Sequence, residues 1–173
     1  MKKGTGVLLQ MCFALLATGQ NGTNKTELFD NKVVVNLPAE LKSFEKIETS
    51  SGTEYNFLNA GKTARLKIAS SSESLEDNDV PDHTDKAIST IKLISGAVII
   101  DDGISLNEGK NIGYFKFLTN NPNGRIFNLN FYGSLNDQLI SGSFSCPEEQ
   151  RGNWEKKMDV LIATLQIRDK IVE

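Results

Sequence analysis

The side chains best suited to nucleophilic catalysis are few in this sequence: one histidine, His83, and two cysteines, Cys12 and Cys146. Such catalysis needs a nucleophile, a base and an orienting group held together. His83 is predicted to lie in the first turn of a helix, whose positive end disfavours a protonated imidazole, and no motif connects it with Cys146. We therefore interpret His83 as an exposed residue at a helix start and Cys146 as a small buried side chain.

The sequence also lacks the short motifs that accompany several kinds of enzyme chemistry. It has no G-x-S-x-G elbow for a serine nucleophile, no glycine-rich phosphate loop and no Cys/His cluster with zinc-ligand spacing. We therefore expect a protein that is not an enzyme and that uses no cofactor.

A run of oxygen-bearing side chains is the remaining candidate for site chemistry. Asp77, Asp79 and Asp82, with Asn78 among them, offer several oxygens from one loop, as calcium prefers. The run lacks the glycine and the glutamate that an EF-hand loop carries at its sixth and twelfth positions. A calcium loop and a solvated acidic loop both stay open; we expect no metal site and keep the three aspartates as candidate binding residues.

The N-terminus has the composition of an export signal. Lys2 and Lys3 precede an apolar run at residues 7–17. Ala17 and Gly19 are small residues at the two positions that a signal peptidase recognises. We predict a signal peptide at residues 1–19, cleavage before Gln20, and an exported protein that is periplasmic or secreted. The run is shorter than the roughly 20 residues that cross a bilayer, so we expect no stable membrane span after cleavage.

Cys12 does not have the surroundings of a lipid-attachment cysteine. Leu9, Gln10 and Met11 precede it where small residues are needed, and the apolar run continues beyond it. Since Cys12 lies in the predicted leader, Cys146 has no disulfide partner in the mature chain.

The charge of the chain argues against nucleic acid as a partner. The formal net charge is −3, and it becomes more negative when Lys2 and Lys3 are removed. The other lysines are scattered and interrupted by carboxylates, whereas binding to phosphates needs a concentrated basic face.

The first half of the chain alternates short patterns and turn signals. We predict a flexible lead-in at residues 20–27, a strand at 29–37 ended by Pro38, and a short helix at 40–47. A hairpin of strands at 55–59 and 64–68 follows. Residues 70–82 are predicted to be a mobile acidic loop, and Asp82 to cap a helix that ends at Gly96.

The second half is predicted to be a meander of strands followed by one helix. Residues 97–106 contain Asp101-Asp102-Gly103, which is either a tight turn or, as we favour, a bend within one long strand. In the strand at 126–132, Phe127, Leu129 and Phe131 share one face, and Asn128 and Asn130 lie on the wetter one. We keep Asn128 and Asn130 as candidate binding residues.

The last segment has the clearest helical periodicity in the sequence. Trp154, Met158, Leu161, Ile162 and Leu165 form one apolar stripe, which we expect to pack on the aromatic face of the sheet. The residues predicted to be structural are Trp154, Phe144, Cys146, Phe127 and Phe131.

This order of elements, with the passage Phe144-Ser145-Cys146-Pro147 followed by Trp154 and the terminal helix, resembles the PsbP-like superfamily. The resemblance covers roughly residues 29–167. It implies an α+β fold, a single twisted antiparallel β-sheet flanked by helices. It carries over no catalytic residue, because members of this superfamily are mostly non-enzymatic binding proteins.

We therefore expect a PsbP-like domain at residues 28–167 and a tail at 168–173. The expected function is that of an exported non-enzymatic binding or accessory protein of the bacterial cell envelope, whose partner is a protein or an envelope component. The alternative is a secretion-system effector chaperone or an immunity-type protein. Fold analogy alone does not fix function.

Overall fold

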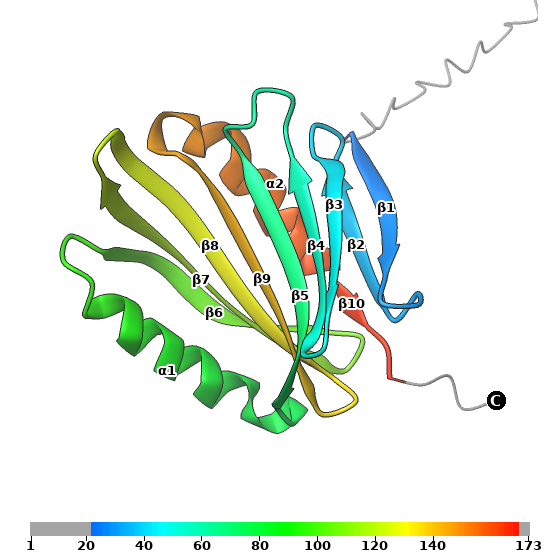
Figure 1. Ribbon diagram of the computed structural model, residues 1–173. Helices are drawn as coiled ribbons and strands as arrows, with labels where there is room; N and C mark the ends of the chain where they lie inside the picture. The colour runs from blue at the N-terminus through cyan, green and yellow to red at the C-terminus, as the bar shows by residue number, and fades with distance from the viewer. Residues whose placement is uncertain (1–21, 170–173) are drawn as a thin grey trace, which may run out of the picture.

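The structure is a computed structural model that describes residues 22–169, and its main feature is a seven-stranded antiparallel sheet (Figure 1). The strand order is β3-β4-β5-β9-β8-β7-β6. The predicted signal peptide therefore lies outside the described residues. The strands of this sheet are β3 (Lys42–Thr49), β4 (Gly52–Leu58), β5 (Arg65–Ser74), β6 (Val98–Asn107), β7 (Lys110–Asn121), β8 (Gly124–Leu135) and β9 (Gln138–Pro147).

A second sheet of three strands lies beside the first. It has the order β1-β2-β10, with β1 (Thr23–Leu28), β2 (Val33–Pro38) and β10 (Gln166–Ile167) all antiparallel. The α+β class predicted from the sequence is confirmed, and this small sheet adds to the large one that was expected.

Two helices cover opposite faces of the large sheet. Helix α1 (Val80–Lys92), preceded by the 3-10 turn η1 (Asp77–Asp79), packs its Ile88 on Phe115 and Phe117 of β7. Lys116 lies between these two residues on β7 and contacts α2 (Arg151–Thr164). The 3-10 turn η2 (Glu148–Gln150) precedes α2. Since consecutive strand residues point to opposite faces, the helices lie on different sides of the sheet.

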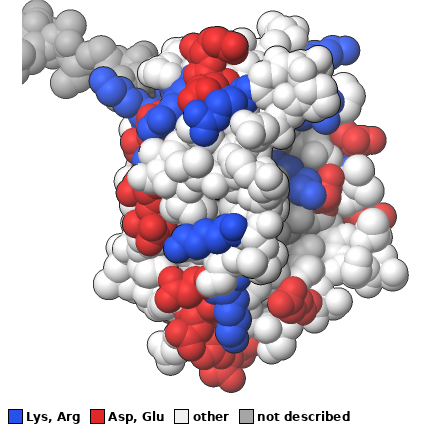
Figure 2. Space-filling model, turned by 90° about the vertical axis from the view of Figure 1, so that its left-hand side faces the viewer, with Lys and Arg blue, Asp and Glu red and all other residues white. Residues whose placement is uncertain are grey.

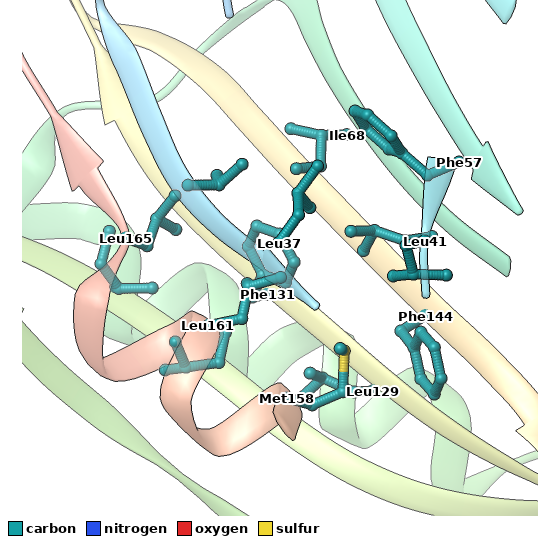
Figure 3. Packing of buried hydrophobic residues seen from close by; sticks show 14 of the residues in the cluster. Leu37, Leu41, Phe57, Ile68, Leu129, Phe131, Phe144, Met158, Leu161 and Leu165 are labelled. Carbon is teal, nitrogen blue, oxygen red and sulfur yellow. The ribbon is translucent and has the colours of Figure 1, made fainter. Parts of the chain in front are cut away.

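The main core lies between the large sheet, α2 and the small sheet. Trp154, Met158 and Leu161 of α2 are buried here together with sheet residues such as Phe131 and Phe144. Figure 3 shows Met158 and Leu161 beside these sheet residues. The predicted apolar stripe is thus confirmed for Trp154, Met158, Leu161 and Ile162. Leu165 is also buried, but it follows the end of the helix at Thr164 and has an extended backbone. The five residues expected to be structural are all at most 2% exposed and belong to this core: Trp154, Phe144, Cys146, Phe127 and Phe131.

Two hairpins of the second half have tight turns. Glu108 and Gly109 between β6 and β7 both have positive φ, 50° and 83°, and so do Asn136 and Asp137 between β8 and β9, 49° and 58°. Two consecutive residues with positive φ suit the twist of a two-residue hairpin. β6 is one strand with an irregularity between Ile99 and Asp101, so the favoured bend is confirmed.

An ion-pair cluster around the buried Lys116 holds α2 against β6 and β7. The Lys116 ammonium, whose side chain is 7% exposed, lies 2.9 Å from Asp101 Oδ2, 2.7 Å from Asp159 Oδ1 and 3.8 Å from Glu155 Oε1. Burial opposes the charge on Lys116, but its hydrogen bonds to Asp159 and Asp101 outweigh this and raise its pKa. Glu155 is held in turn by Arg151, whose Nε lies 2.8 Å from Oε2.

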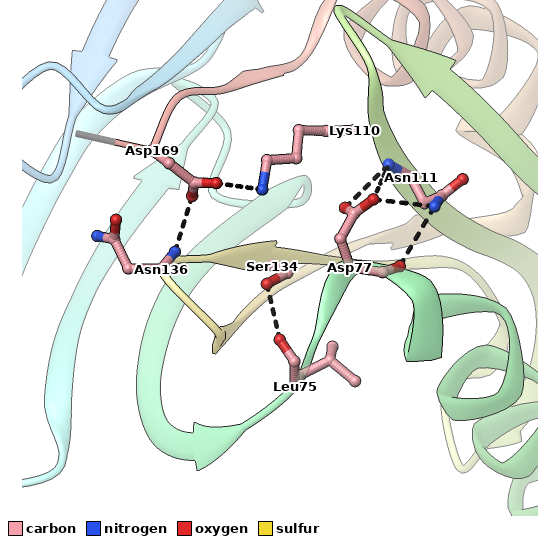
Figure 4. Close-up of polar contacts among 7 residues, drawn as sticks. All are labelled: Leu75, Asp77, Lys110, Asn111, Ser134, Asn136 and Asp169. Atoms are coloured by element: carbon pink, nitrogen blue, oxygen red, sulfur yellow. Dashed lines mark hydrogen bonds and ion pairs between the residues drawn. The ribbon is translucent and has the colours of Figure 1, made fainter. Parts of the chain in front are cut away.

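Polar contacts also fasten the segment before α1 and the end of the chain (Figure 4). The Asp77 carboxylate accepts hydrogen bonds from the backbone N–H of Asn111 at 3.1 Å and from its side-chain amide at 2.9 Å. Asp169 pairs with Lys110 and accepts a hydrogen bond from the Asn136 N–H at 2.8 Å. Both contacts join segments that are far apart in the sequence.

Two predictions for the first half of the chain are wrong. Residues 20–27, predicted to be flexible, include strand β1, which pairs with β2 from Thr23 to Leu28. Residues 40–47, predicted to be helical, lie mostly in edge strand β3. Of the three residues behind that helix, Leu41 is buried, whereas Phe44 and Ile47 are 63% and 37% exposed.

The predicted mobile acidic loop at residues 70–82 is also wrong. Strand β5 continues to Ser74, η1 follows, and α1 already begins at Val80. Asp82 is therefore inside the helix, and Asp79 stands at the N-cap without a side-chain capping bond. The helix ends at Lys92, and Gly96, with φ of 78°, follows in the connection to β6. The hairpin of β4 and β5 is confirmed.

Candidate functional site

One face of the large sheet is only partly covered. Helix α1 packs over β7 and β8, where it covers Phe115, Phe117 and Tyr132 (Figure 1). Towards β9, β5, β4 and β3 the same face has half-buried or exposed residues such as Ser143 and Lys67. We call the outward-facing part of these four strands the open face.

The register brings a row of polar side chains together across the open face. Glu45 lies opposite Asn56, Asn56 opposite Lys67, Lys67 opposite Ser143, and Ser143 opposite Asn130. Residues directly opposite in neighbouring antiparallel strands project to the same side of the sheet. Asn130, predicted from its alternation with buried aromatic residues, therefore stands at the end of this row nearest α1.

A second row runs parallel to the first. Leu58 lies opposite Arg65, Arg65 opposite Ser145, and Ser145 opposite Asn128. The two candidate asparagines thus lie on the same face as Arg65 and Lys67 and next to the serines of β9. The Asn128 amide donates to Thr119 Oγ1 at 3.0 Å and to the Ile126 carbonyl at 3.1 Å, so its orientation is fixed.

The open face contains a groove of about 410 Å³. Phe44 and Ile47 of β3 form its apolar side, and Phe44 is the residue that the β3–β4 register skips between Ser43 and Glu45. A bulge of this kind redirects a side chain and is frequent at sheet edges. The remaining lining residues are Glu45, Glu54, Asn56, Phe57, Leu58, Arg65, Leu66, Lys67, Ser143 and Ser145.

The two basic residues of the groove differ in their partners. Lys67 Nζ lies 3.5 Å from Glu54 Oε2, and the Asn56 amide donates to Glu54 Oε1 at 2.9 Å. Arg65 is exposed and takes part in none of the ion pairs found between residues 22 and 169. The groove therefore offers one guanidinium whose donors are free for a ligand.

The three candidate aspartates are not gathered into one site. Asp77 is turned to Asn111, whereas Asp79 and Asp82 line a separate hollow of about 330 Å³ with Glu73 and His83. Within residues 22–169, no group of three or more His, Cys, Asp or Glu side chains is arranged to hold a metal ion.

His83 and Cys146 lie apart. The His83 ring stacks edge-on against Tyr132, with centroids 4.7 Å apart, on the α1 side of the sheet. Cys146 is 1% exposed in the core on the α2 side, and burial raises the pKa of its thiol to about 12. The two residues therefore do not form a nucleophile and base pair.

Sequence reasoning missed Arg65, Lys67 and the serines of β9 as neighbours of Asn128 and Asn130. The alternation of Arg65-Leu66-Lys67-Ile68 shows that the two basic residues share a face. What it does not contain is the pairing of β5 with β9, whose partner residues are about 75 positions apart in the chain. Phe44 was missed for another reason, because its spacing from Leu41 and Ile47 suggested a helix.

In the part of the chain that the structure describes, no helix has the length and apolar character needed to cross a membrane.

Figure 2, a view from the α1 side, shows basic and acidic side chains interspersed over that face of the molecule.

No protein-family model matches the sequence, and no curated protein is significantly similar to it in sequence. Solved structures do resemble it. A protein of Bacteroides thetaiotaomicron superposes with a TM-score of 0.57 and 17% identity over 87% of this chain, which spans only 50% of that protein. PsbP of Synechocystis sp. PCC 6803 superposes with a TM-score of 0.59 and 11% identity, over 87% of this chain and 95% of its own.

A third similar structure is LpqN of Mycobacterium tuberculosis, which is involved in cell envelope biogenesis. Its TM-score is 0.52 at 10% identity, and the superposition covers 84% of this chain and 90% of LpqN. Identities this low show the fold and nothing finer. The chain has the α+β fold shared by PsbP, Mog1 and LpqN.

Proposed function

We propose that this protein is a non-enzymatic accessory protein that binds a partner in the groove of the open face. The observation that carries the proposal is the combination, in one groove, of an exposed aromatic residue, Phe44, with a guanidinium free of ion pairs, Arg65. Phe and Arg are both enriched at protein interfaces, and Arg is also frequent among the residues that contribute most to binding energy. The groove volume of about 410 Å³ lies within the roughly 300–1,000 Å³ of ligand sites.

The chemistry of the groove suits binding better than bond breaking. Its polar side chains are two serine hydroxyls, the Asn56 amide, two basic groups and two carboxylates, and the Glu54 carboxylate is already engaged by Lys67 and Asn56. The only histidine of the sequence, His83, is part of α1 and does not line the groove, and the buried thiol of Cys146 lies on the other face of the sheet. Such a surface can hold a partner by hydrogen bonds, one charge and an apolar contact.

We also propose that the protein is exported and is a bacterial member of the PsbP-like proteins. Its support is the leader pattern of residues 1–19, together with the fold shared with LpqN, an envelope-biogenesis protein. Fold likeness is an analogy and not a demonstration. The proposed partner is a protein or another component of the envelope.

Position-specific photo-crosslinking tests whether the groove is the binding surface. A photoreactive phenylalanine analogue at Phe44 or Ile47 is expected to give defined adducts in cells that produce the protein. The matched control places the same group at Leu93, which is 86% exposed but lies in the α1–β6 connection. Adducts of equal yield and identity from Leu93 would contradict the groove as the site.

The mature N-terminus tests the export part of the proposal. The full-length chain with a C-terminal tag is recovered from separated cell fractions, and its first residue is determined by mass spectrometry. A start at Gln20 in the envelope or the medium is expected. An intact Met1 in the cytoplasm would overturn export and favour the alternative, an effector chaperone of a secretion system.

A further inference from the structure

The groove has a preferred ligand charge because its two basic residues are not equivalent. Lys67 is paired with Glu54, whereas the guanidinium of Arg65 has no ion-pair partner in the described residues. A guanidinium presents a planar fork of donors that matches a carboxylate in a two-point contact. The ligand group that fits at Arg65 is therefore an anion.

The carboxylates of the groove favour a singly charged anion over a phosphate. Glu45 stands on β3, two strands away from Arg65 on β5. With neighbouring strands about 4.8 Å apart, Glu45 and Arg65 are separated by about one Debye length, which is about 8–10 Å at physiological salt. Screening therefore weakens the repulsion between Glu45 and a ligand carboxylate bound at Arg65. A phosphate carries nearly twice the charge, which exceeds the single positive charge of Arg65, because the charge of Lys67 is already balanced by Glu54.

The rim of the groove adds an apolar contact beside the charged one. Phe44, 63% exposed, is placed by the bulge of β3, and Ile47 lies on the same rim. An apolar ligand side chain that packs between them removes both surfaces from water, which favours binding. A free carboxylate ion alone would not use this rim.

The length and floor of the groove suit an extended chain. Four strands, β3, β4, β5 and β9, line it, and at their usual spacing they span about 14 Å, the length of four or five extended residues. Asn56, Ser143 and Ser145 on the floor supply both donors and acceptors, as a peptide backbone requires. A folded domain would not enter a hollow of this size.

From these three features we infer that the partner presents a short extended peptide segment in which an acidic side chain binds Arg65 and a nearby apolar side chain packs against Phe44 and Ile47. The inference rests on the proposed function, since it names the kind of partner that the groove takes. It assigns Arg65 as the residue that determines specificity for charge.

An NMR titration measures how capped synthetic hexapeptides bind to the protein. The isotope-labelled protein consists of residues 20–173, the product of the proposed cleavage. One peptide alternates Glu with Phe or Val, and its counterpart carries Gln in place of every Glu. The Glu peptide is expected to shift the amide signals of Arg65, Ser143 and Ser145 and to bind about tenfold more tightly than the Gln peptide. A charge-assisted hydrogen bond of this kind accounts for such a factor.

Variants separate the charge at Arg65 from general electrostatics. Arg65→Gln is expected to remove the preference for Glu over Gln, while Arg65→Lys keeps part of it. The matched control is Arg125→Gln, because Arg125 is a similarly exposed arginine that pairs with Glu148 at 3.6 Å outside the groove. Equal affinity for the two peptides, or an equal loss in the Arg125 variant, would overturn the inference.

The outcome is distinct from that of the crosslinking experiment. Crosslinks specific to Phe44 and Ile47, combined with no preference for the Glu peptide, would leave the groove as the binding surface and reject the acidic peptide. Loss of both results would reject the proposed function itself.

Discussion

Trp154 is the residue through which the last helix packs on the large sheet. Its side chain is 2% exposed, and its ring centroid lies 5.3 Å from that of Phe144 on β9. The Lys157 ammonium covers the ring at 5.1 Å. The residue therefore joins an apolar core to a polar helix surface.

Replacing Trp154 with Ala should lower the free energy of unfolding by about 3–5 kcal/mol, because the lost side chain leaves a large cavity. Urea unfolding followed by circular dichroism measures the change. The Trp154→Phe variant is expected to lose clearly less, since it keeps a ring against Phe144. A shift of the thermal midpoint under about one degree in the Ala variant would contradict this role.

Lys116 is the charged residue on which α2 depends. Substitution by Met removes the ammonium and leaves Asp101, Asp159 and Glu155 facing one another without it. We expect a loss of about 1–3 kcal/mol, which is less than the roughly 3–5 kcal/mol for breaking a fully buried pair, because the carboxylates are partly solvated. Lys67→Met, which breaks an exposed pair with Glu54, should cost less than about 1 kcal/mol. Equal losses in urea unfolding would refute the difference.

For single residues, the sequence predicts which side chains are buried better than it predicts which residues they contact. Alternation along β8 and β9 and the helical stripe of α2 are enough to place Phe127, Phe131, Phe144, Cys146 and Trp154 in the core. The partners of Lys116 come from β6 and α2, so neither local pattern nor charge count could identify them. The same holds for the contact of Asp77 with Asn111, because the two residues lie on separate elements, η1 and β7.

Among the elements, β3 shows where periodicity misleads. Leu41, Phe44 and Ile47 recur every third residue, as on a helix, but the segment is short and short apolar patterns do not distinguish helix from strand. β3 is an edge strand whose eight residues are all exposed. Its conformation is determined by pairing with β4, and its bulge exposes Phe44 to the groove.

The contact between β9 and β8 can be tested with a pair of glycines. A Cβ added at Gly142 would lie 1.9 Å from the Phe131 ring, whereas at Gly152 in α2 nothing lies within 4 Å. Gly142→Ala should therefore destabilise the protein by about 1–3 kcal/mol or more through overpacking. Gly152→Ala should be neutral or stabilising by up to about 1 kcal/mol, because alanine favours the helix. Thermal unfolding of both variants measures these changes in stability. A Gly142→Ala variant as stable as the original protein would contradict the close packing.

For the whole molecule, several carboxyl groups link the stability of the fold to pH. The hydrogen bond from Lys157 lowers the pKa of Glu40, and that from Arg151 lowers the pKa of Glu155. Burial of Asp169 opposes its charge, but hydrogen bonds from Lys110 and Asn136 outweigh this and lower its pKa. A carboxyl with a lowered pKa stabilises the fold above its unfolded pKa, and this contribution is lost as the pH falls through the folded value.

We therefore expect the urea midpoint to fall as the pH is lowered from about 5 to 3, since the usual value for Glu is 4.5. In Glu155→Gln the fall should be shallower, because the group no longer titrates. Glu76→Gln is the matched control, since Glu76 is exposed and makes no ion pair in the described residues. An unchanged slope in Glu155→Gln would contradict this assignment.

Local patterns in the sequence are sufficient to predict the α+β class, the succession of strands along the chain from β4 onward and the buried face of α2. These features follow from local periodicity and turn chemistry, which act over a few residues. The tertiary structure decided that residues 23–28 form a strand, that β3 is not a helix, and that β5 lies beside β9. Each depends on hydrogen bonds and burial supplied by segments far along the chain, and it is the pairing of β5 with β9 that brings Arg65 and the serines into one groove.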